Sequence, residues 1–342
     1  MLENIFKSDA IAIYRIDDEE NTPLLNRYIV SSQDTREICN DPQVCGIEYT
    51  SKLEHTCMLV LKAMPDFSPI ILKERQTMVL NVLRGGLNFG LREALAQAYG
   101  WNIHSTSFIS AQRTRVASNS EEWHIIESEY KKLYLPENAQ IVFGDVVATG
   151  TSLQHALKLI VKEAIASETP IANMVFFTFG GERAEVILRE ISELCKKEFE
   201  GFSGIDLFYL EGRFMVPSPD TLLSIKLTGT DLVRKDALMA PEFIASQYEL
   251  PYFPLERCVI YDAGSRAFHL DDYVADVVDY WSRTKELAAQ GITFNELIAE
   301  RFPNIDPTKF GKQNLMSLCE QHIGKINRLL IPKENTQEEQ GV

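Results

Sequence analysis

Between residues 77 and 210, short continuous apolar runs alternate with longer segments in which apolar residues recur at helical spacing. The first pattern predicts buried strands, and the second predicts amphipathic helices. We expect strands at 77–83, 103–110, 140–145, 171–179 and 205–210, and helices at 89–99, 151–166 and 182–198. Because strands that alternate with helices form parallel sheets with right-handed crossovers, the pattern predicts an α/β fold, a parallel sheet flanked by helices.

The segments outside this core carry weaker patterns. Helical spacing predicts a helix at 50–64, within the otherwise ambiguous residues 1–76, and another at 271–289. The polar end of the chain, 333–342, predicts a disordered tail. We interpret residues 1–332 as one elaborated domain with N-terminal, inserted and C-terminal additions.

The stretch 141–153 (IVFGDVVATGTSL) has the pattern of a strand, a turn and the start of a helix. Gly150 can adopt backbone angles that other residues avoid, and the free N–H groups of the following helix favour a phosphate. Asp145, at the end of the strand, can accept hydrogen bonds from sugar hydroxyls. The candidate phosphate-binding residues are Ala148, Thr149, Gly150, Thr151 and Ser152.

By itself this stretch is also compatible with an ordinary connection between a strand and a helix. Two other phosphate-binding patterns fit less well. The dinucleotide fingerprint GxGxxG is absent here, and no lysine follows a glycine as a P-loop requires. The stretch therefore favours a phosphorylated sugar over a dinucleotide or a nucleoside triphosphate.

A second stretch, 77–90 (TMVLNVLRGGLNFG), is an apolar strand that breaks at Arg84, Gly85 and Gly86. Successive glycines let the backbone approach a ligand closely, and the arginine offers a fork of donors suited to phosphate oxygens. A Gly-Gly turn with a surface arginine is the alternative interpretation.

Together these residues resemble the PRPP-binding motif of type I phosphoribosyltransferases, and ATG followed by Ser152 is most similar to the uracil phosphoribosyltransferase branch. The general motif has two adjacent acidic residues, where this chain has Gly144 and then Asp145. The resemblance implies that Asp145 contacts the ribose and that residues 148–152 hold the 5′-phosphate. It also implies that Arg84, Gly85 and Gly86 hold the pyrophosphate.

The same resemblance implies a base-binding loop at 261–268 (YDAGSRAF), where Asp262, Ala263, Gly264 and Arg266 match the uracil enzymes. In that family the main chain of this loop reads the base, so Asp262, Ala263 and Gly264 are the implied base-binding residues. Tyr261 stands where the family has glycine. An Asp-Ala-Gly turn taken alone is an ordinary turn.

The polar stretch AQRTRVASNSEEW, which begins at residue 111, occupies the place of the family's mobile loop. A polar loop of about a dozen residues in a compact domain is often an active-site lid. Arg113 and Arg115 are candidates for closing over the pyrophosphate, with Lys132 a lesser one; a solvated basic pair is the alternative. The resemblance covers about 77–210 and 259–268, so residues 216–257 are an insertion relative to the family.

The implied activity joins a nucleobase, with uracil as the expected base, to PRPP, giving a nucleoside monophosphate and pyrophosphate. Mg²⁺ would be bound by the substrate, since this ion prefers substrate oxygens and water to a dedicated protein cage. Three alternatives stay open. One is a regulator that senses PRPP without turnover, which Gly144 and Tyr261 favour; another is an enzyme for a different base; the third is an RNA-binding regulator.

Composition argues against the last alternative. The chain has 34 Lys and Arg against 49 Asp and Glu, a net charge of −15, and binding to a nucleic-acid backbone needs clustered positive charge. The scattered cysteines and histidines predict reduced thiols and no protein-bound metal. No apolar run of about eighteen residues and no signal pattern occur, so we expect a cytoplasmic protein without a membrane partner. A homodimer is expected from the resemblance.

Overall fold

The computed structural model describes residues 1–17, 23–83, 85–110, 112–115, 123–127, 130–218, 220–225, 232–257 and 270–330, with only the backbone at 85, 112–115 and 123–127. Its centre is a ten-stranded sheet with the order β1-β2-β3-β11-β10-β9-β4-β5-β8, and β12 pairs with β11. The strands are β1 (Leu2–Lys7), β2 (Ile11–Ile16), β3 (Leu25–Ser32), β4 (Thr77–Leu83), β5 (Ser105–Ser110), β8 (Lys131–Lys132), β9 (Ala139–Val147), β10 (Ile171–Gly181), β11 (Ile205–Met215) and β12 (Val233–Met239).

The sheet is mixed, which corrects the expectation of a parallel sheet. The six neighbouring strands β3, β11, β10, β9, β4 and β5 are parallel to one another. Strands β1, β2, β8 and β12 join antiparallel at the margins. Strands β4, β9, β10 and β11 carry the near-continuous apolar runs of a sheet buried on both faces, whereas β1, β8 and β12 at the margins lack that signal.

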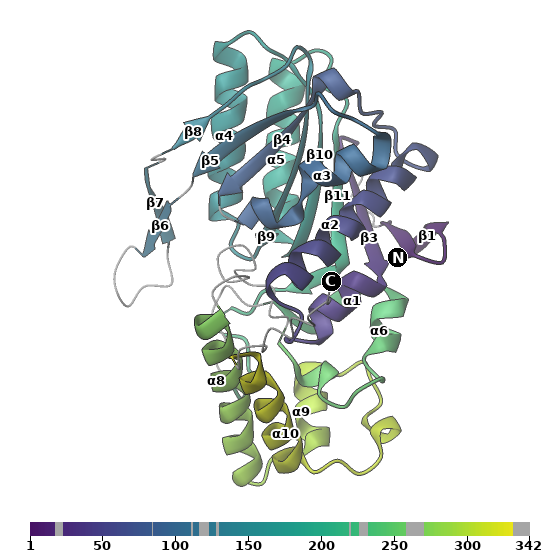
Figure 1. Ribbon diagram of the computed structural model, residues 1–342, viewed down its shortest axis with the longest axis vertical. Helices are drawn as coiled ribbons and strands as arrows, with labels where there is room; N and C mark the ends of the chain where they lie inside the picture. The colour runs from purple at the N-terminus through teal and green to yellow at the C-terminus, as the bar shows by residue number, and fades with distance from the viewer. Residues whose placement is uncertain are drawn as a thin grey trace, which may run out of the picture.

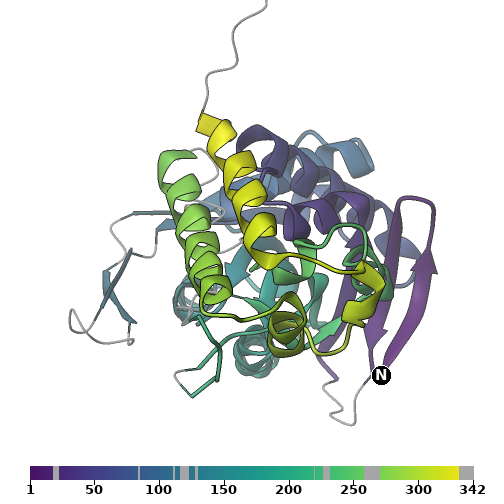
Figure 2. The same ribbon diagram turned by 90° about the horizontal axis from the view of Figure 1, so that it is seen from below.

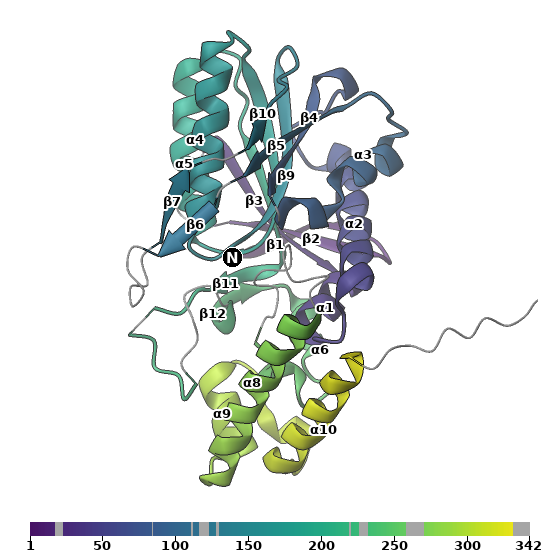
Figure 3. The same cartoon turned by 60° about the vertical axis from the view of Figure 1, so that its left-hand side comes forward.

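Helices cover both faces of the sheet (Figure 1). On one face lie α2 (Gly46–Ala63) and α3 (Leu91–Tyr99), and on the other α4 (Thr151–Ala166) and α5 (Arg183–Glu198), as Figure 3 shows from the side. Short 3₁₀ turns are η1 (Met64–Asp66), η2 (Glu74–Gln76) and η3 (Gly85–Phe89). The predicted core strands and helices are confirmed, because their apolar spacing reflects burial against the sheet.

The N-terminal residues, which the sequence left ambiguous, build one margin of the sheet. Strands β1 and β2 form an antiparallel pair beside β3, and β3 pairs parallel with β11, with Leu25 opposite Ile205. The short helix α1 (Gln33–Asn40) follows β3 and begins with a capping box between Ser32 and Thr35. The N-terminal addition is therefore part of the sheet and not a separate unit beside it.

Residues 240–257 and 270–330 form what we call the helical module, which lies beyond the carboxyl ends of the parallel strands (Figures 1 and 3). Figure 2 looks at this module end-on, with the sheet behind it. It contains α6 (Pro241–Ser246), η4 (Phe253–Leu255), α8 (Leu270–Ala289), α9 (Phe294–Arg301), η5 (Pro307–Phe310), α10 (Leu315–Asn327) and η6 (Arg328–Leu330). Its buried Trp281 and Phe302 belong to the same apolar cluster as the sheet.

Among the described residues, no helix is long and apolar enough to cross a membrane. The cysteines at 39, 45, 57, 195 and 319 are free thiols, and all but Cys45 are buried. This agrees with the prediction of reduced core cysteines, while Cys258 lies outside the described residues.

Two buried carboxylates connect the sheet to its neighbours. Glu185 in α5 is fully buried and pairs with Arg27 of β3 and Arg213 of β11, each at 3.1 Å. Glu211 adopts a left-handed φ of 64° in β11 and accepts hydrogen bonds from Ser31 Oγ at 2.6 Å and the Ser32 N–H at 3.0 Å. Both carboxylates satisfy donors that would otherwise be buried without partners.

Burial raises the pKa of Glu211 from 4.5 to about 7, and it raises the pKa of Asp206 from 3.8 to about 6. The folded protein therefore binds these protons more tightly than the unfolded chain does. Each group stabilises the folded protein at pH values below its pKa in the unfolded chain. This stabilisation is lost as the pH rises through the pKa of the group in the folded protein.

We expect Glu211→Gln to change the pH dependence of stability. Glutamine has nearly the shape of glutamate but does not titrate. The free energy of unfolding of the parent should therefore fall relative to that of the variant as the pH rises from 4.5 to 7. The relative fall should be on the order of 1–3 kcal/mol. Urea denaturation across this range measures it. A difference between parent and variant that stays constant with pH would contradict the assignment.

Candidate functional site

The two glycine-containing loops predicted from the sequence begin on neighbouring strands. Strands β4 and β9 are adjacent and parallel, with Thr77 opposite Gln140 and Leu80 opposite Phe143. The chain leaves β4 through α3 towards β5, and it leaves β9 through α4 towards β10 on the other side. This is a topological switch point, where open α/β sheets bind ligands outside the carboxyl ends of their strands. We call residues 85–89, 144–145 and 148–152 the switch-point site.

The start of α4 is built around Gly150. Its φ of +73° lies in the left-handed region, and a Cβ there would come within 2.4 Å of Ile187 Cδ1. The N–H of Gln154 donates to the carbonyl of Gly150 at 2.9 Å, so the N–H groups of 151–153 precede the first intrahelical bond of this turn. Glycine is thus required by both the backbone angle and the space, and the turn presents main-chain donors.

Hydroxyl groups flank this turn on both sides. Thr149 and Thr151 are half-buried, with their Oγ1 atoms 3.4 Å apart, and Ala148 and Ser152 are half-buried as well. The predicted phosphate-binding residues are therefore brought together, and they combine side-chain donors with the positive end of the α4 dipole. Such a turn can bind a phosphate group.

Asp145 lies near the carboxyl end of β9 and is half-buried. Its Oδ1 accepts a hydrogen bond from the N–H of Val146 at 2.9 Å, and its main-chain carbonyl accepts one from Thr178 Oγ1 at 2.8 Å. Strands β9 and β10 thus hold this residue three positions before the start of the 148–152 turn. A carboxylate here can accept hydrogen bonds from hydroxyl groups of a ligand bound at the turn.

The loop after β4 is held against β9 by a close contact between Phe89 and Gly144. Phe89 is 1% exposed, and a Cβ at Gly144 would lie 2.4 Å from Cγ of its ring. A Cβ at Gly86 would lie 3.1 Å from the carbonyl oxygen of Gly144. The glycines therefore let the two loops approach each other more closely than side chains would permit. This contact explains why glycine occupies the position where the family motif has an acid.

The sequence did not identify Phe89 as a member of this site. A signal was available, because a glycine inside a strand often marks a place where another part of the chain approaches closely. Gly144 occupies such a position in β9. The partner that approaches it could not be named without the fold.

Several predicted site residues lie outside the part that the structure describes. Arg84 is one of them, although Gly85 and Gly86 are placed in η3. The implied base-binding residues Asp262, Ala263 and Gly264 fall within the undescribed segment 258–269, as does Tyr261.

Arg113 and Arg115 lie in a short strand instead of the predicted loop. Strand β6 (Gln112–Arg115) pairs antiparallel with β7 (Trp123–Glu127), with Arg115 opposite Trp123. Pairing between β6 and β7 therefore takes the place of part of the predicted polar loop. The loop of this hairpin, residues 116–122, lies outside the described residues.

No protein-family model matches the chain, and no curated protein matches it. Among solved structures, a hypoxanthine phosphoribosyltransferase from Staphylococcus aureus is 12% identical with a TM-score of 0.25, over 52% of this chain and 74% of its own. A hypoxanthine-guanine phosphoribosyltransferase from L. donovani is 18% identical with a TM-score of 0.26, over 40% and 74%. A hypoxanthine phosphoribosyltransferase from Trypanosoma cruzi is 14% identical with a TM-score of 0.26, over 58% and 92%.

These TM-scores are too low to assign a family or a substrate to the chain.

We predict that Gly144→Ala destabilises the protein by about 1–3 kcal/mol, the usual cost of overpacking. The added methyl group would collide with the Phe89 ring, whose Cγ lies 2.4 Å from its position. Gly201→Ala is the matched control, because a Cβ at Gly201 would meet nothing within 4 Å. Urea denaturation measures both. Equal stability of the two variants would disprove the contact, and Phe89→Leu should partly rescue Gly144→Ala.

Proposed function

We propose that the protein is a phosphoribosyltransferase that joins a nucleobase to PRPP, giving a nucleoside monophosphate and pyrophosphate. One observation carries the proposal: the loop after β4 and the turn before α4 meet at a topological switch point, with Asp145 on the strand that leads into the turn. The geometry supplies a phosphate-binding turn, a carboxylate and a second glycine-rich loop at one sheet edge. A sugar that carries phosphate groups at two positions fits this arrangement.

In this proposal the main-chain N–H groups and hydroxyls of 148–152 bind the 5′-phosphate. Asp145 orients the ribose hydroxyls and favours the positive charge that develops at the reacting carbon. Gly85 and Gly86 let the backbone approach the pyrophosphate, which Arg84 contacts through charge-assisted hydrogen bonds. Arg113 and Arg115 of the β6–β7 hairpin are the proposed residues that close over it.

The base would be held by the main chain of Asp262, Ala263 and Gly264, and uracil is the first base to test. A Mg²⁺ ion carried by PRPP would neutralise charge on the leaving pyrophosphate, and the half-buried carboxylate of Asp145 is an oxygen ligand of the kind this ion accepts. Positioning and electrostatics would supply most of the rate enhancement.

The Phe89–Gly144 contact favours a second candidate, a regulator that binds PRPP without turnover. The ring of Phe89 occupies the space beside β9 where a second acidic side chain would stand in the family motif. Asp145 is then the remaining member of that acidic pair. PRPP could still bind, but the positive charge that develops at the reacting carbon would be stabilised by one carboxylate instead of two. Binding without turnover would distinguish this candidate from the enzyme.

The deciding experiment incubates the purified protein with PRPP, Mg²⁺ and a panel of bases and measures pyrophosphate release. We expect release with at least one base, uracil being the first, and no release when the base is omitted. Tight binding of PRPP without release for any base in the panel would reject the enzyme in favour of the regulator.

Substitutions in the two loops should weaken the binding of different parts of PRPP. Thr149→Val and Ser152→Ala each remove a donor to the 5′-phosphate, so both should weaken PRPP and a nucleoside monophosphate by similar factors. Arg84→Ala should weaken PRPP more than the monophosphate, by some ten- to hundredfold for a charge-assisted hydrogen bond. Isothermal titration calorimetry measures these affinities.

Thr169→Val is the control for the hydroxyl variants, since Thr169 follows the far end of α4 and donates to the carbonyl of Ser167 at 3.2 Å. It should bind both ligands as the parent does. If Arg84→Ala weakens both ligands equally, the assignment of the β4 loop to pyrophosphate is wrong.

A further inference from the structure

The first turn of α5 lies beside the 148–152 turn of the switch-point site. Strands β9 and β10 are adjacent and parallel, with Val147 opposite Gly180, so the helices that follow them begin at the same edge of the sheet. Helices α4 and α5 run side by side on one face (Figure 3), and Gln154 of α4 donates to Glu190 of α5 at 3.2 Å. The positive ends of both helix dipoles therefore lie at the edge where the proposed function places the 5′-phosphate.

The absence of a side chain at Gly180 lets β10 end close to β9. A Cβ there would lie 3.0 Å from the carbonyl oxygen of Val147 and 2.9 Å from Thr178 Oγ1. Ala184 and Ile187, in the first turns of α5, are buried at 0% and 1% exposure. The start of α5 is thus fixed against the sheet, next to the turn that begins α4.

Arg183, the first residue of α5, lies against this turn. A Cβ at Gly150 would be 3.2 Å from Arg183 Cγ, while the arginine side chain as a whole is exposed. Arginine commonly packs its hydrocarbon stem on the protein and keeps its charged end in water. The stem of Arg183 is therefore anchored at the turn, and its guanidinium extends beyond that anchor.

The guanidinium of Arg183 is not engaged by the protein. Within the described ranges it forms no hydrogen bond and no ion pair, although Glu182 and Glu185 are close to it in the sequence. The carboxylate of Glu185 is buried and already pairs with Arg27 and Arg213, each at 3.1 Å. The donors of Arg183 are thus available to a ligand.

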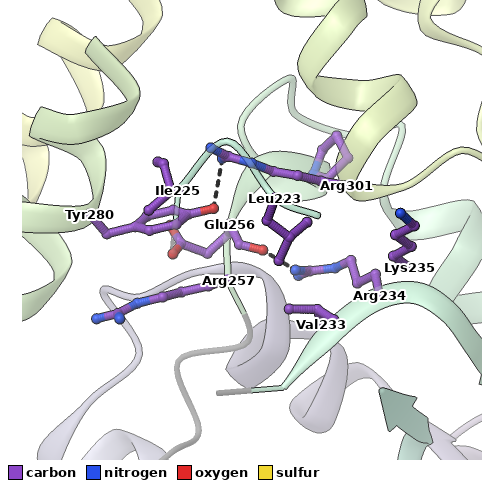
Figure 4. Close-up of a pocket in the computed structure, with 10 residues that line it drawn as sticks. Leu223, Ile225, Val233, Arg234, Lys235, Glu256, Arg257, Tyr280 and Arg301 are labelled. Atoms are coloured by element: carbon purple, nitrogen blue, oxygen red, sulfur yellow. Dashed lines mark hydrogen bonds between the residues drawn. The ribbon is translucent and has the colours of Figure 1, made fainter. Parts of the chain in front are cut away.

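Two other arginines show the contrasting case. Arg234 and Arg301 line a pocket between β12 and the helical module (Figure 4). Arg234 donates to the carbonyls of Glu256 and of Cys39, the latter at 2.9 Å. Arg301 donates to the hydroxyl of Tyr280 at 2.7 Å. These guanidinium groups satisfy acceptors of the protein itself, so neither is free as Arg183 is.

We propose that Arg183 binds the 5′-phosphate of the ligand held at the 148–152 turn, an inference that rests on the proposed function. A phosphate monoester carries about two negative charges at neutral pH. The main-chain N–H groups and hydroxyls of the turn supply donors but no full positive charge. Arg183 supplies that charge, together with a planar fork of donors that matches two phosphate oxygens.

Isothermal titration calorimetry with PRPP and with ribose 5-phosphate tests this proposal. We expect Arg183→Gln to weaken both ligands by a similar factor of about ten, because each loses charge-assisted hydrogen bonds to its 5′-phosphate. This equal loss differs from that of Arg84→Ala, which should affect PRPP more. Arg183→Lys should retain part of the affinity, since lysine keeps the charge without the fork.

Lys162→Gln is the matched control, because it removes the same charge from an exposed position towards the far end of α4. It should bind both ligands as the parent does, and thermal melting shows whether each variant is folded. The proposal is overturned if the parent does not bind ribose 5-phosphate or if Arg183→Gln binds both ligands like the control. A loss confined to PRPP would also overturn it, because Arg183 would then contact the pyrophosphate.

The test separates this contact from the proposed activity, since calorimetry requires neither a base nor turnover. Pyrophosphate release by a protein whose PRPP affinity does not depend on Arg183 would reject the contact and leave the enzyme standing. Binding of ribose 5-phosphate that depends on Arg183, without release for any base, would reject the enzyme and leave the contact standing.

Discussion

The close approach of the β4 loop to β9 is the constraint on which the candidate site depends. The Phe89 ring packs on the backbone of Gly144, and Gly86 approaches the Gly144 carbonyl, so the two loops share one edge of the sheet in close contact. Protein interiors are close-packed, and a methyl group at this point has no space to enter. The position of the loop that would meet a pyrophosphate is thus set by packing behind it, which leaves the front of the loop available to a ligand.

Two buried charged groups are satisfied in different ways. Within the sheet, buried carboxylates such as Glu185 gather arginines from neighbouring elements into ion pairs. Arg234 of β12, which contacts Glu256 of the helical module, is instead buried among neutral acceptors. The first arrangement pairs opposite charges, whereas in the second the guanidinium donates to main-chain carbonyls and an amide. A single apolar cluster connects the sheet and the helical module.

The spacing of apolar residues predicted the strands and helices whose buried side can be seen within a short stretch of sequence. Helix α4 is found at 151–166 and β4 at 77–83, as their apolar spacing predicted, and the residues of the 148–152 turn meet as expected. Strand β3 was missed because Arg27 interrupts its apolar pattern, and the buried carboxylate that pairs with Arg27, Glu185, lies 158 positions away in the chain. Phe89 and the pocket around Arg234 depend in the same way on contacts between distant segments, which spacing along the sequence does not record.

The two ends of the strand order have a consequence for assembly. The terminal strand β8 consists of two exposed lysines, and the register of the other terminal strand, β1, shifts between Asn4 and Phe6. A short lysine strand and a bulge both discourage the pairing of a further strand from another molecule. Two copies are thus discouraged from joining into one continuous sheet through these edges. A homodimer of the kind that the sequence resemblance implies would form more readily through another surface, and the same blunt edges discourage aggregation through β1 and β8.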